Sequence, residues 1–100
     1  MIVRFVRQAE QDLEDIADFI ARENPARALS FVKELRMKAA ALAQAPHAFP
    51  VMQRYEDQGI RRRIHGSYAI LYRVDGAALS ILHILHTARD IDTILSAGEE

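Results

Sequence analysis

The sequence of 100 residues contains no cysteine and no long hydrophobic run. Without cysteine, disulfide bonds, zinc sites with thiolate ligands and cysteine nucleophiles are all excluded. The start of the chain lacks the apolar segment of a signal peptide, and no window approaches the ~20 apolar residues that span a membrane. We therefore expect a cytoplasmic protein that makes no contact with membranes.

Two classes of catalytic motif are also missing. No serine lies in a nucleophile-elbow pattern, and there is no glycine-rich loop that would cradle phosphates. These absences argue against the corresponding hydrolases and nucleotide-binding enzymes, and we expect no cofactor. The net charge is −1, with 13 basic and 14 acidic residues, so the whole-chain charge gives no reason to expect direct nucleic-acid binding.

What the chain does contain is typical of a globular protein. Half of its residues are hydrophobic and 27% are charged, a balance far from that of disordered chains. The length suits one domain of common size. We expect a single domain over residues 1–100.

The N-terminal half predicts one strand followed by two helices. Residues Ile2–Arg7 are apolar with interleaved arginines, which favours a short strand. From Ala9 the apolar residues recur at three- and four-residue steps, as in an amphipathic helix, and acidic residues fill the other positions. Asn24-Pro25 predicts the end of this helix and the N-cap of a second, basic helix that ends before Pro46. The short connection predicts an antiparallel hairpin of the two helices.

The C-terminal half predicts β-structure after a loop over Pro46–Gly59. The strands are expected over Ile60–His65, Tyr68–Val74 and Leu79–His86. Asp75-Gly76 is a strong hairpin signal, and Leu79–His86 is apolar on both faces, which indicates a central strand that is covered on both sides. A short helix is expected over Ile91–Leu95, before a tail at residues 98–100 that should fray. The predicted fold class is α+β, in the order β-α-α-β-β-β, with an antiparallel sheet packed against a two-helix hairpin.

Basic side chains are concentrated on the predicted sheet. Because alternate residues of a strand share a face, Arg61 and Arg63 are expected on one face and Arg62 on the other. Such a face is either a binding surface for phosphates or carboxylates, which pair with the planar guanidinium group, or a solvated face that pairs with local acids. The candidate partner-binding residues are Arg61, Arg63, Arg73, His83, His86 and Arg89.

Neither the histidines nor the acids of the first helix predict a catalytic or metal site. His83 and His86 are three residues apart on one strand, so they are expected on opposite faces and cannot share a metal ion. Asp12, Glu14 and Asp15 have no basic or histidine companion nearby in the sequence. We interpret them as ordinary acids of the N-terminal half of a helix.

The order of these elements resembles the RelE/ParE superfamily of small toxins from prokaryotic toxin–antitoxin modules. The similarity extends over residues 2–95. The motifs that carry it are AEQDLEDI at 9–16, NPARA at 24–28, IRR at 60–62, YAILYRV at 68–74 and ILHTARD at 84–90. The C-terminal motifs look like the ParE branch.

The ParE resemblance implies a toxin that binds DNA gyrase, traps its cleaved complex with DNA and has no chemistry of its own. It also implies a cognate antitoxin, ParD-like or other, and therefore a hetero-oligomer. Such antitoxins usually donate an extended or helical segment that wraps around the toxin. If that segment is acidic, we expect it to contact Arg61, Arg73 and Arg89.

Two alternatives remain open within the superfamily. RelE-like members cut messenger RNA in the ribosome, and several of them use an arginine after the central-strand tyrosine and a C-terminal tyrosine. Here Ala69 follows Tyr68, and no tyrosine follows Arg89. The residues that remain for a nuclease are Arg61, Arg63, His86 and Arg89. The other alternative is a diverged protein with a toxin fold that only binds its antitoxin.

Overall fold

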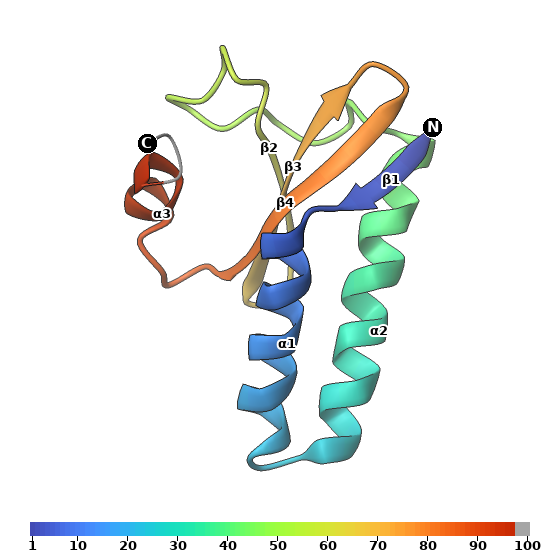
Figure 1. The fold of residues 1–100 in the computed structure, drawn as a ribbon, viewed down its shortest axis with the longest axis vertical. Coiled ribbons are helices and arrows are strands. Elements are labelled where there is room, and N and C mark those ends of the chain that lie inside the picture. Colours follow the sequence, from blue (N-terminus) through green and yellow to red (C-terminus); the bar gives the residue numbers. More distant parts are fainter. Residues whose placement is uncertain (98–100) are drawn as a thin grey trace.

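The computed structural model describes residues 1–97, and the tail predicted to fray, residues 98–100, lies outside the described residues. The elements are β1 (Ile2–Phe5), α1 (Arg7–Ala21), α2 (Pro25–Ala41), the short 3-10 helix η1 (Leu42–Gln44), β2 (Arg61–His65), β3 (Tyr68–Asp75), β4 (Ala78–His86) and α3 (Ile91–Ala97). This order confirms the predicted β-α-α-β-β-β arrangement and the short helix that follows it (Figure 1). None of the helices within residues 1–97 has the length and apolar character needed to cross a membrane.

The four strands form one sheet in the order β1-β4-β3-β2. The strands β2, β3 and β4 are antiparallel, as predicted, and Gly76 adopts the positive φ of 60° that suits the turn between β3 and β4. β1 differs, because it runs parallel to β4. Parallel neighbours need a long crossover connection, and the helical hairpin lies in the connection that follows β1.

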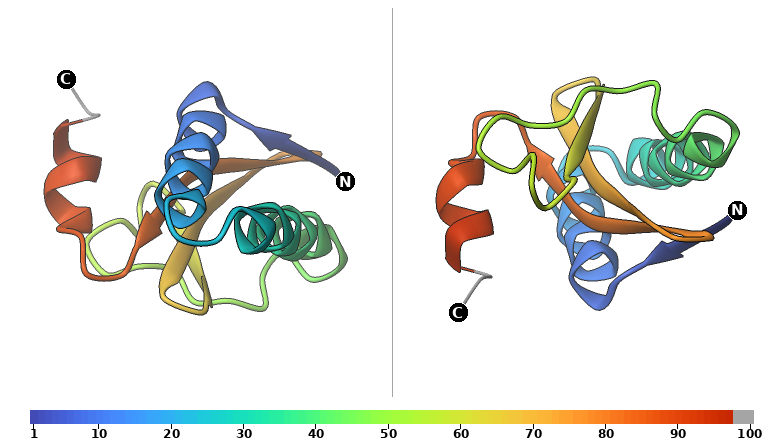
Figure 2. Two further views of the ribbon diagram at one scale, coloured as in Figure 1. Left: turned by 90° about the horizontal axis from the view of Figure 1, so that it is seen from below. Right: turned by 90° about the horizontal axis from the view of Figure 1, so that it is seen from above.

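The sheet lies between two hydrophobic layers. The helical hairpin covers one face, where the cluster includes Leu13, Ile16, Phe31, Leu35, Ile70, Tyr72, Ile81 and Ile84. The loop before β2 and α3 cover the other face, with Tyr55, Ile60, Ala69, Leu71, Leu85 and Leu95. Figure 2 shows the hairpin and α3 on opposite sides of the sheet. Because β4 contributes to both layers and lies between two other strands, its predicted central position is confirmed.

Local signals explain the start of α2 and its pairing with α1. The side chain of Asn24 accepts a hydrogen bond of 3.0 Å from the backbone nitrogen of Arg27, and Pro25 occupies the first helical position, as predicted. Across the hairpin, Arg36 bonds to both carboxylate oxygens of Glu10, at 3.0 and 2.7 Å. These hydrogen bonds hold the pKa of Glu10 below its ordinary value.

The boundary between β1 and α1 falls earlier than predicted, at Phe5 instead of Arg7. β1 follows β4 as far as Ile81, where the backbone nitrogen of Val6 donates to the carbonyl oxygen of Ile81. The carbonyl of Val6 then accepts the hydrogen bond from Glu10 that opens the helix. The strand therefore ends where its pairing with β4 ends, which the local sequence does not reveal.

Beyond Ile81, β4 no longer pairs with β1, and α1 contacts this edge of the strand instead. Asp12 is only 6% exposed, and its Oδ2 accepts a hydrogen bond of 2.9 Å from the backbone nitrogen of Ile84. The same oxygen lies 3.2 Å from Nδ1 of His83, and Oδ1 accepts a bond of 2.9 Å from Gln8. The Asp12 carboxylate thus replaces the carbonyl that a neighbouring strand would supply.

Replacing Asp12 by alanine leaves the buried amide of Ile84 without its acceptor. We expect Asp12→Ala to lower the free energy of unfolding by about 2–3 kcal/mol, and Asp12→Asn, which keeps an acceptor oxygen, to lower it less. Asp15→Ala, at an exposed position of the same helix, should change it by no more than about 0.5 kcal/mol. Urea unfolding measures the three values. Equal unfolding midpoints for Asp12→Ala and Asp15→Ala would contradict the role of Asp12 at the strand edge.

Candidate functional site

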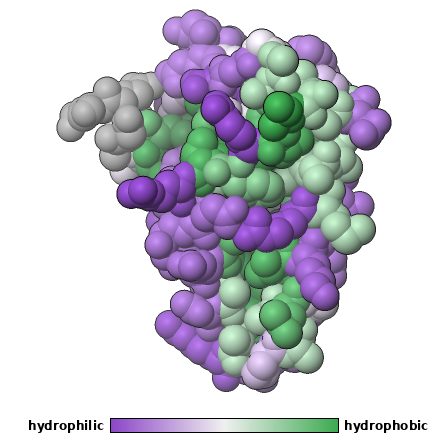
Figure 3. Space-filling model, turned by 45° about the vertical axis from the view of Figure 1, so that its right-hand side comes forward, coloured by the Kyte–Doolittle hydropathy of each residue, from purple (hydrophilic) through white to green (hydrophobic). Residues whose placement is uncertain are grey.

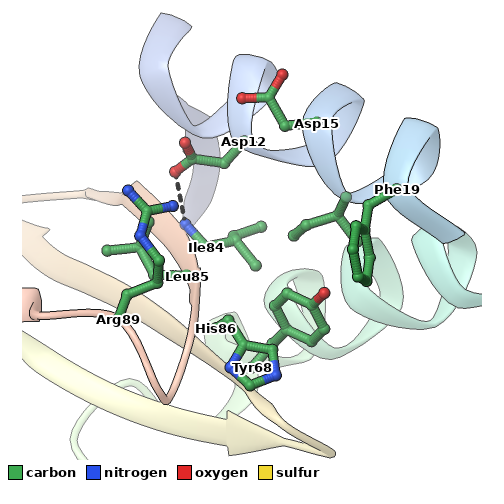
Figure 4. A pocket seen from close by; sticks show the side chains of 9 residues that line it. Asp12, Asp15, Phe19, Tyr68, Ile84, Leu85, His86 and Arg89 are labelled. Carbon is green, nitrogen blue, oxygen red and sulfur yellow. Dashed lines mark hydrogen bonds between the residues drawn. The ribbon is translucent and has the colours of Figure 1, made fainter.

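A cleft with a volume of about 290 Å³ lies between α1 and the C-terminal end of β4. We name it the α1–β4 cleft. Its lining residues are Asp12, Asp15, Ile16, Phe19, Tyr68, Ile84, Leu85, His86 and Arg89. A second hollow of about 500 Å³ adjoins it and shares Asp12, Asp15, Leu85 and Arg89. In Figure 4, α1 supplies one wall of the cleft, and Tyr68 and His86 lie opposite it.

The middle of the cleft is apolar and open to solvent. Ile16 and Ile84 are buried at its base, whereas Phe19 is 63% exposed at its rim. An amphipathic helix normally turns a side chain of this size toward the core. An exposed aromatic ring beside a hollow is typical of a surface that a partner covers.

A row of aromatic rings fixes the wall opposite α1. Tyr68 lies between Phe31 and His86, with ring centres 5.5 Å and 5.1 Å apart, and Phe31 in turn stacks on His65 at 5.6 Å. Burial raises the pKa of the Tyr68 hydroxyl above its ordinary value. The hydroxyl therefore stays neutral and can donate a hydrogen bond in the cleft.

Opposite charges lie at the α1 wall and at the end of β4. Asp15 projects from α1, and Arg89 follows β4 in a turn where its backbone nitrogen donates to the carbonyl of His86 at 2.9 Å. Among residues 1–97, the guanidinium group of Arg89 has no hydrogen-bond or ion-pair partner. Oδ1 of Asp15 accepts a hydrogen bond of 3.0 Å from Gln11, which leaves its second carboxylate oxygen and the guanidinium group of Arg89 for a partner that enters the cleft.

The hydrogen bonding of His86 limits the chemistry of the cleft. Its Nδ1 lies 3.0 Å from the backbone nitrogen of Ala88, which can only donate. A neutral imidazole that accepts at Nδ1 carries its hydrogen on Nε2, so the ring can donate there but has no second lone pair to act as a base. His86 therefore acts as a hydrogen-bond donor toward a ligand in the cleft. Within residues 1–97, no group of three or more histidine or carboxylate side chains is placed so that it could hold a metal ion.

Arg61 and Arg63 lie away from this cleft. Nη1 of Arg61 donates hydrogen bonds to the carbonyl of Phe49 at 2.6 Å and to that of His47 at 3.4 Å. The guanidinium group of Arg63 lies 4.8 Å from the ring centre of Phe49. Both arginines therefore hold the loop between η1 and β2 against the sheet.

Of the remaining candidates, Arg73 lies apart from the cleft, whereas His83 lines the adjoining hollow together with Arg89. Arg73 bonds to Asp75 at 3.0 Å, and His83 bonds to Asp12. His83 pairs with Leu71 and His86 pairs with Tyr68, which belong to opposite layers, so the expected placement of the two histidines on opposite faces is confirmed. Of the six candidate residues, the structure brings only His86 and Arg89 together in the cleft.

Sequence reasoning set aside the acids of α1 because no basic companion was nearby in the sequence. The fold brings His83 to Asp12 from 71 residues away and places Arg89 in the same cleft as Asp12 and Asp15. One signal was present in the sequence. Asp12 directly precedes Leu13 at the border of the apolar stripe, and an acid at that position borders the core.

The contacts of Arg61 and the free guanidinium of Arg89 give opposite expectations for stability. Arg61→Ala removes the hydrogen bonds to the loop, and we expect it to lower the free energy of unfolding by about 1–2 kcal/mol. Arg89→Ala removes no such contact and should change it by no more than about 0.5 kcal/mol. Thermal and urea unfolding of both variants test this difference. Equal losses of stability would show that the loop does not depend on Arg61.

Comparisons with known proteins agree on one group. Residues 3–91 match the family described as the ParE toxin of the type II toxin–antitoxin system parDE. Among solved structures, the chain is similar to the chromosomal ParDE system of P. aeruginosa, with a TM-score of 0.73 and 25% identity over 86% of this chain and 95% of that chain. It is also similar to the toxin–antitoxin complex RelBE2 of Mycobacterium tuberculosis, with a TM-score of 0.64 and 26% identity over 85% of this chain and 95% of that chain. Comparison with curated proteins gives no match.

Proposed function

Because the chain belongs to the ParE toxin family of type II toxin–antitoxin systems, we propose that it inhibits DNA gyrase by binding and that a cognate antitoxin neutralises it. We also propose that the protein is cytoplasmic, where it would encounter gyrase and the antitoxin. The single observation that supports binding over catalysis is the dispersal of the basic residues. Arg61 and Arg63 are engaged with the loop at Phe49, apart from His86 and Arg89.

The principal alternative is a ribosome-dependent messenger RNA endonuclease, which the similarity to a RelBE complex favours. Cleavage next to a ribose 2′-hydroxyl needs one group that takes a proton and another that gives one. His86 is the imidazole of the cleft, and its Nδ1 is occupied by the backbone of Ala88. The neutral ring of His86 is therefore not available as the base of such a cleavage.

We assign the α1–β4 cleft to the antitoxin. Both solved structures described above contain toxin–antitoxin pairs, which supports a partner of this kind. The cleft would take an apolar side chain between Phe19 and Tyr68, an acidic group at Arg89 and a basic group at Asp15. The result would be a hetero-oligomer in which the exposed ring of Phe19 is covered.

Parallel assays of gyrase and of translation separate the two activities. We expect purified toxin, freed of antitoxin, to abolish supercoiling by gyrase and to accumulate cleaved DNA, while messenger RNA in a translating ribosome system stays intact. The readouts are gel analysis of plasmid topology and mapping of messenger ends.

The control for both assays is the same protein preincubated with its antitoxin, which should restore the untreated result. Messenger cuts at codon positions with normal gyrase activity would overturn the proposal in favour of the endonuclease. Inactivity in both assays with antitoxin binding retained would instead favour a diverged protein that only binds its antitoxin.

The assignment of the cleft predicts which arginine contacts the antitoxin. Arg89→Glu reverses the charge at the cleft, and we expect it to weaken the complex by about tenfold or more, since like charges would face each other. Phe19→Asp should weaken it similarly because the apolar contact is lost. Isothermal titration calorimetry measures the affinities.

Arg62→Glu is the matched control for Arg89→Glu, because it makes the same charge change outside the cleft, at an exposed residue of β2 that is not one of the candidate partner-binding residues. It should leave the affinity within about threefold. If both Arg89→Glu and Phe19→Asp leave the affinity unchanged, the antitoxin does not bind in this cleft.

A further inference from the structure

The outer face of the α1–α2 hairpin, which is the side turned away from the sheet, exposes two large hydrophobic residues. Leu29 and Met37 are each 71% exposed, and their spacing of eight residues places them on the same side of α2. Lys33 lies midway between them. In Figure 3, which turns the α2 side toward the viewer, two hydrophobic areas are separated by a band of hydrophilic residues.

The same face carries charges that the monomer leaves unpaired. Glu14 on α1 and Lys33 on α2 are both exposed, and within residues 1–97 neither has an ion-pair partner. Elsewhere the hairpin does pair its charges, as in the Arg36–Glu10 bond between the helices. An acid on one helix and a base on the other are therefore free for intermolecular contact.

The two free charges lie at the same height along the hairpin. The Arg36–Glu10 bond fixes which residues of the antiparallel helices are level with each other. Advancing four residues along α1 and going back four along α2 puts Glu14 level with the residue before Lys33. Counting from the tip, where α1 ends and α2 begins, gives the same alignment.

A two-fold axis parallel to the helices keeps every residue at its height and places α1 of one copy over α2 of the other. Glu14 of each copy then lies opposite Lys33 of its partner, so the ion pair forms twice. Leu29 lies at the height of Ala17, where the small side chain leaves room for it. Met37 lies at the height of Ala9, in the first turn of α1.

We propose that a second copy of this chain occupies the outer face of the hairpin in a symmetric dimer. Self-association accounts for an acid and a base at one height on neighbouring helices, because a two-fold axis requires that alignment whereas an unrelated partner does not. Stable interfaces bury about 800 Å² on each partner, and two helices only ~25 Å long offer a smaller area. The dimer is therefore weak and depends on concentration.

Charge reversal with rescue tests the dimer. Sedimentation velocity on the purified protein over a range of concentrations gives its dissociation constant. Lys33→Glu and Glu14→Lys should each raise that constant by about tenfold or more, because two symmetric pairs become repulsive at once. The double variant that carries both reversals restores opposite charges and should return the constant to within about threefold of the original.

Lys38→Glu is the matched control, because Lys38 is exposed on α2 at about 140° around the helix from Lys33. It should leave the dimer unchanged, and circular dichroism confirms that each variant is folded. A protein that stays monomeric at about 1 mM, or single reversals that the double variant does not rescue, would overturn the dimer. Reversals that weaken only the antitoxin complex would assign this face to the antitoxin and likewise overturn it.

Discussion

The Asp12 carboxylate at the edge of β4 is the contact on which the geometry of the cleft depends. β1 pairs with β4 only as far as Ile81, and an open strand edge exposes donors that need acceptors. Asp12 supplies the acceptor for Ile84 and, through the same oxygen, bonds to His83. Because this contact locks α1 against β4, the side chains one turn or two further along α1 face the wall formed by β3 and β4. The cleft therefore follows from the way in which α1, and not another strand, supplies the hydrogen-bond acceptor at this edge of the sheet.

The arginines of this protein divide into those that build the fold and those that remain free. Arg61 donates hydrogen bonds to carbonyl oxygens of the loop, and Arg63 lies over the ring of Phe49. Arg89 stands in a tight turn after β4 with its guanidinium group available. Residue type and strand position did not distinguish these roles, since all three look alike in a basic sequence pattern. Only the contacts of each guanidinium group do.

Features that depend on neighbouring residues were predictable from the sequence, whereas features that depend on distant ones were not. The cap at Asn24-Pro25 and the turn between β3 and β4 are local. The structure has the cap as predicted, whereas the turn falls one residue later, at Gly76-Ala77, because Asp75 still belongs to β3 and pairs with Ala78. The parallel direction of β1 and its early end at Phe5 depend on pairing with β4, more than 70 residues away. The cleft depends on Asp12 meeting His83 across the same separation. Helical periodicity places Asp12 beside the core, but it cannot say which strand edge the carboxylate meets.

Helix α1 presents three surfaces, and its period of 3.6 residues separates them. Ala9, Leu13 and Ile16 pack in the core, Asp12, Asp15 and Phe19 border the cleft, and Gln11 and Glu14 lie on the outer face. A partner in the cleft and a second copy on the outer face would thus contact the same helix without sharing a side chain. Since the core stripe and the Asp12 contact set how α1 packs on the sheet, they also set where the two surfaces lie relative to each other. One short helix can in this way serve a heterologous partner and a symmetric one at the same time.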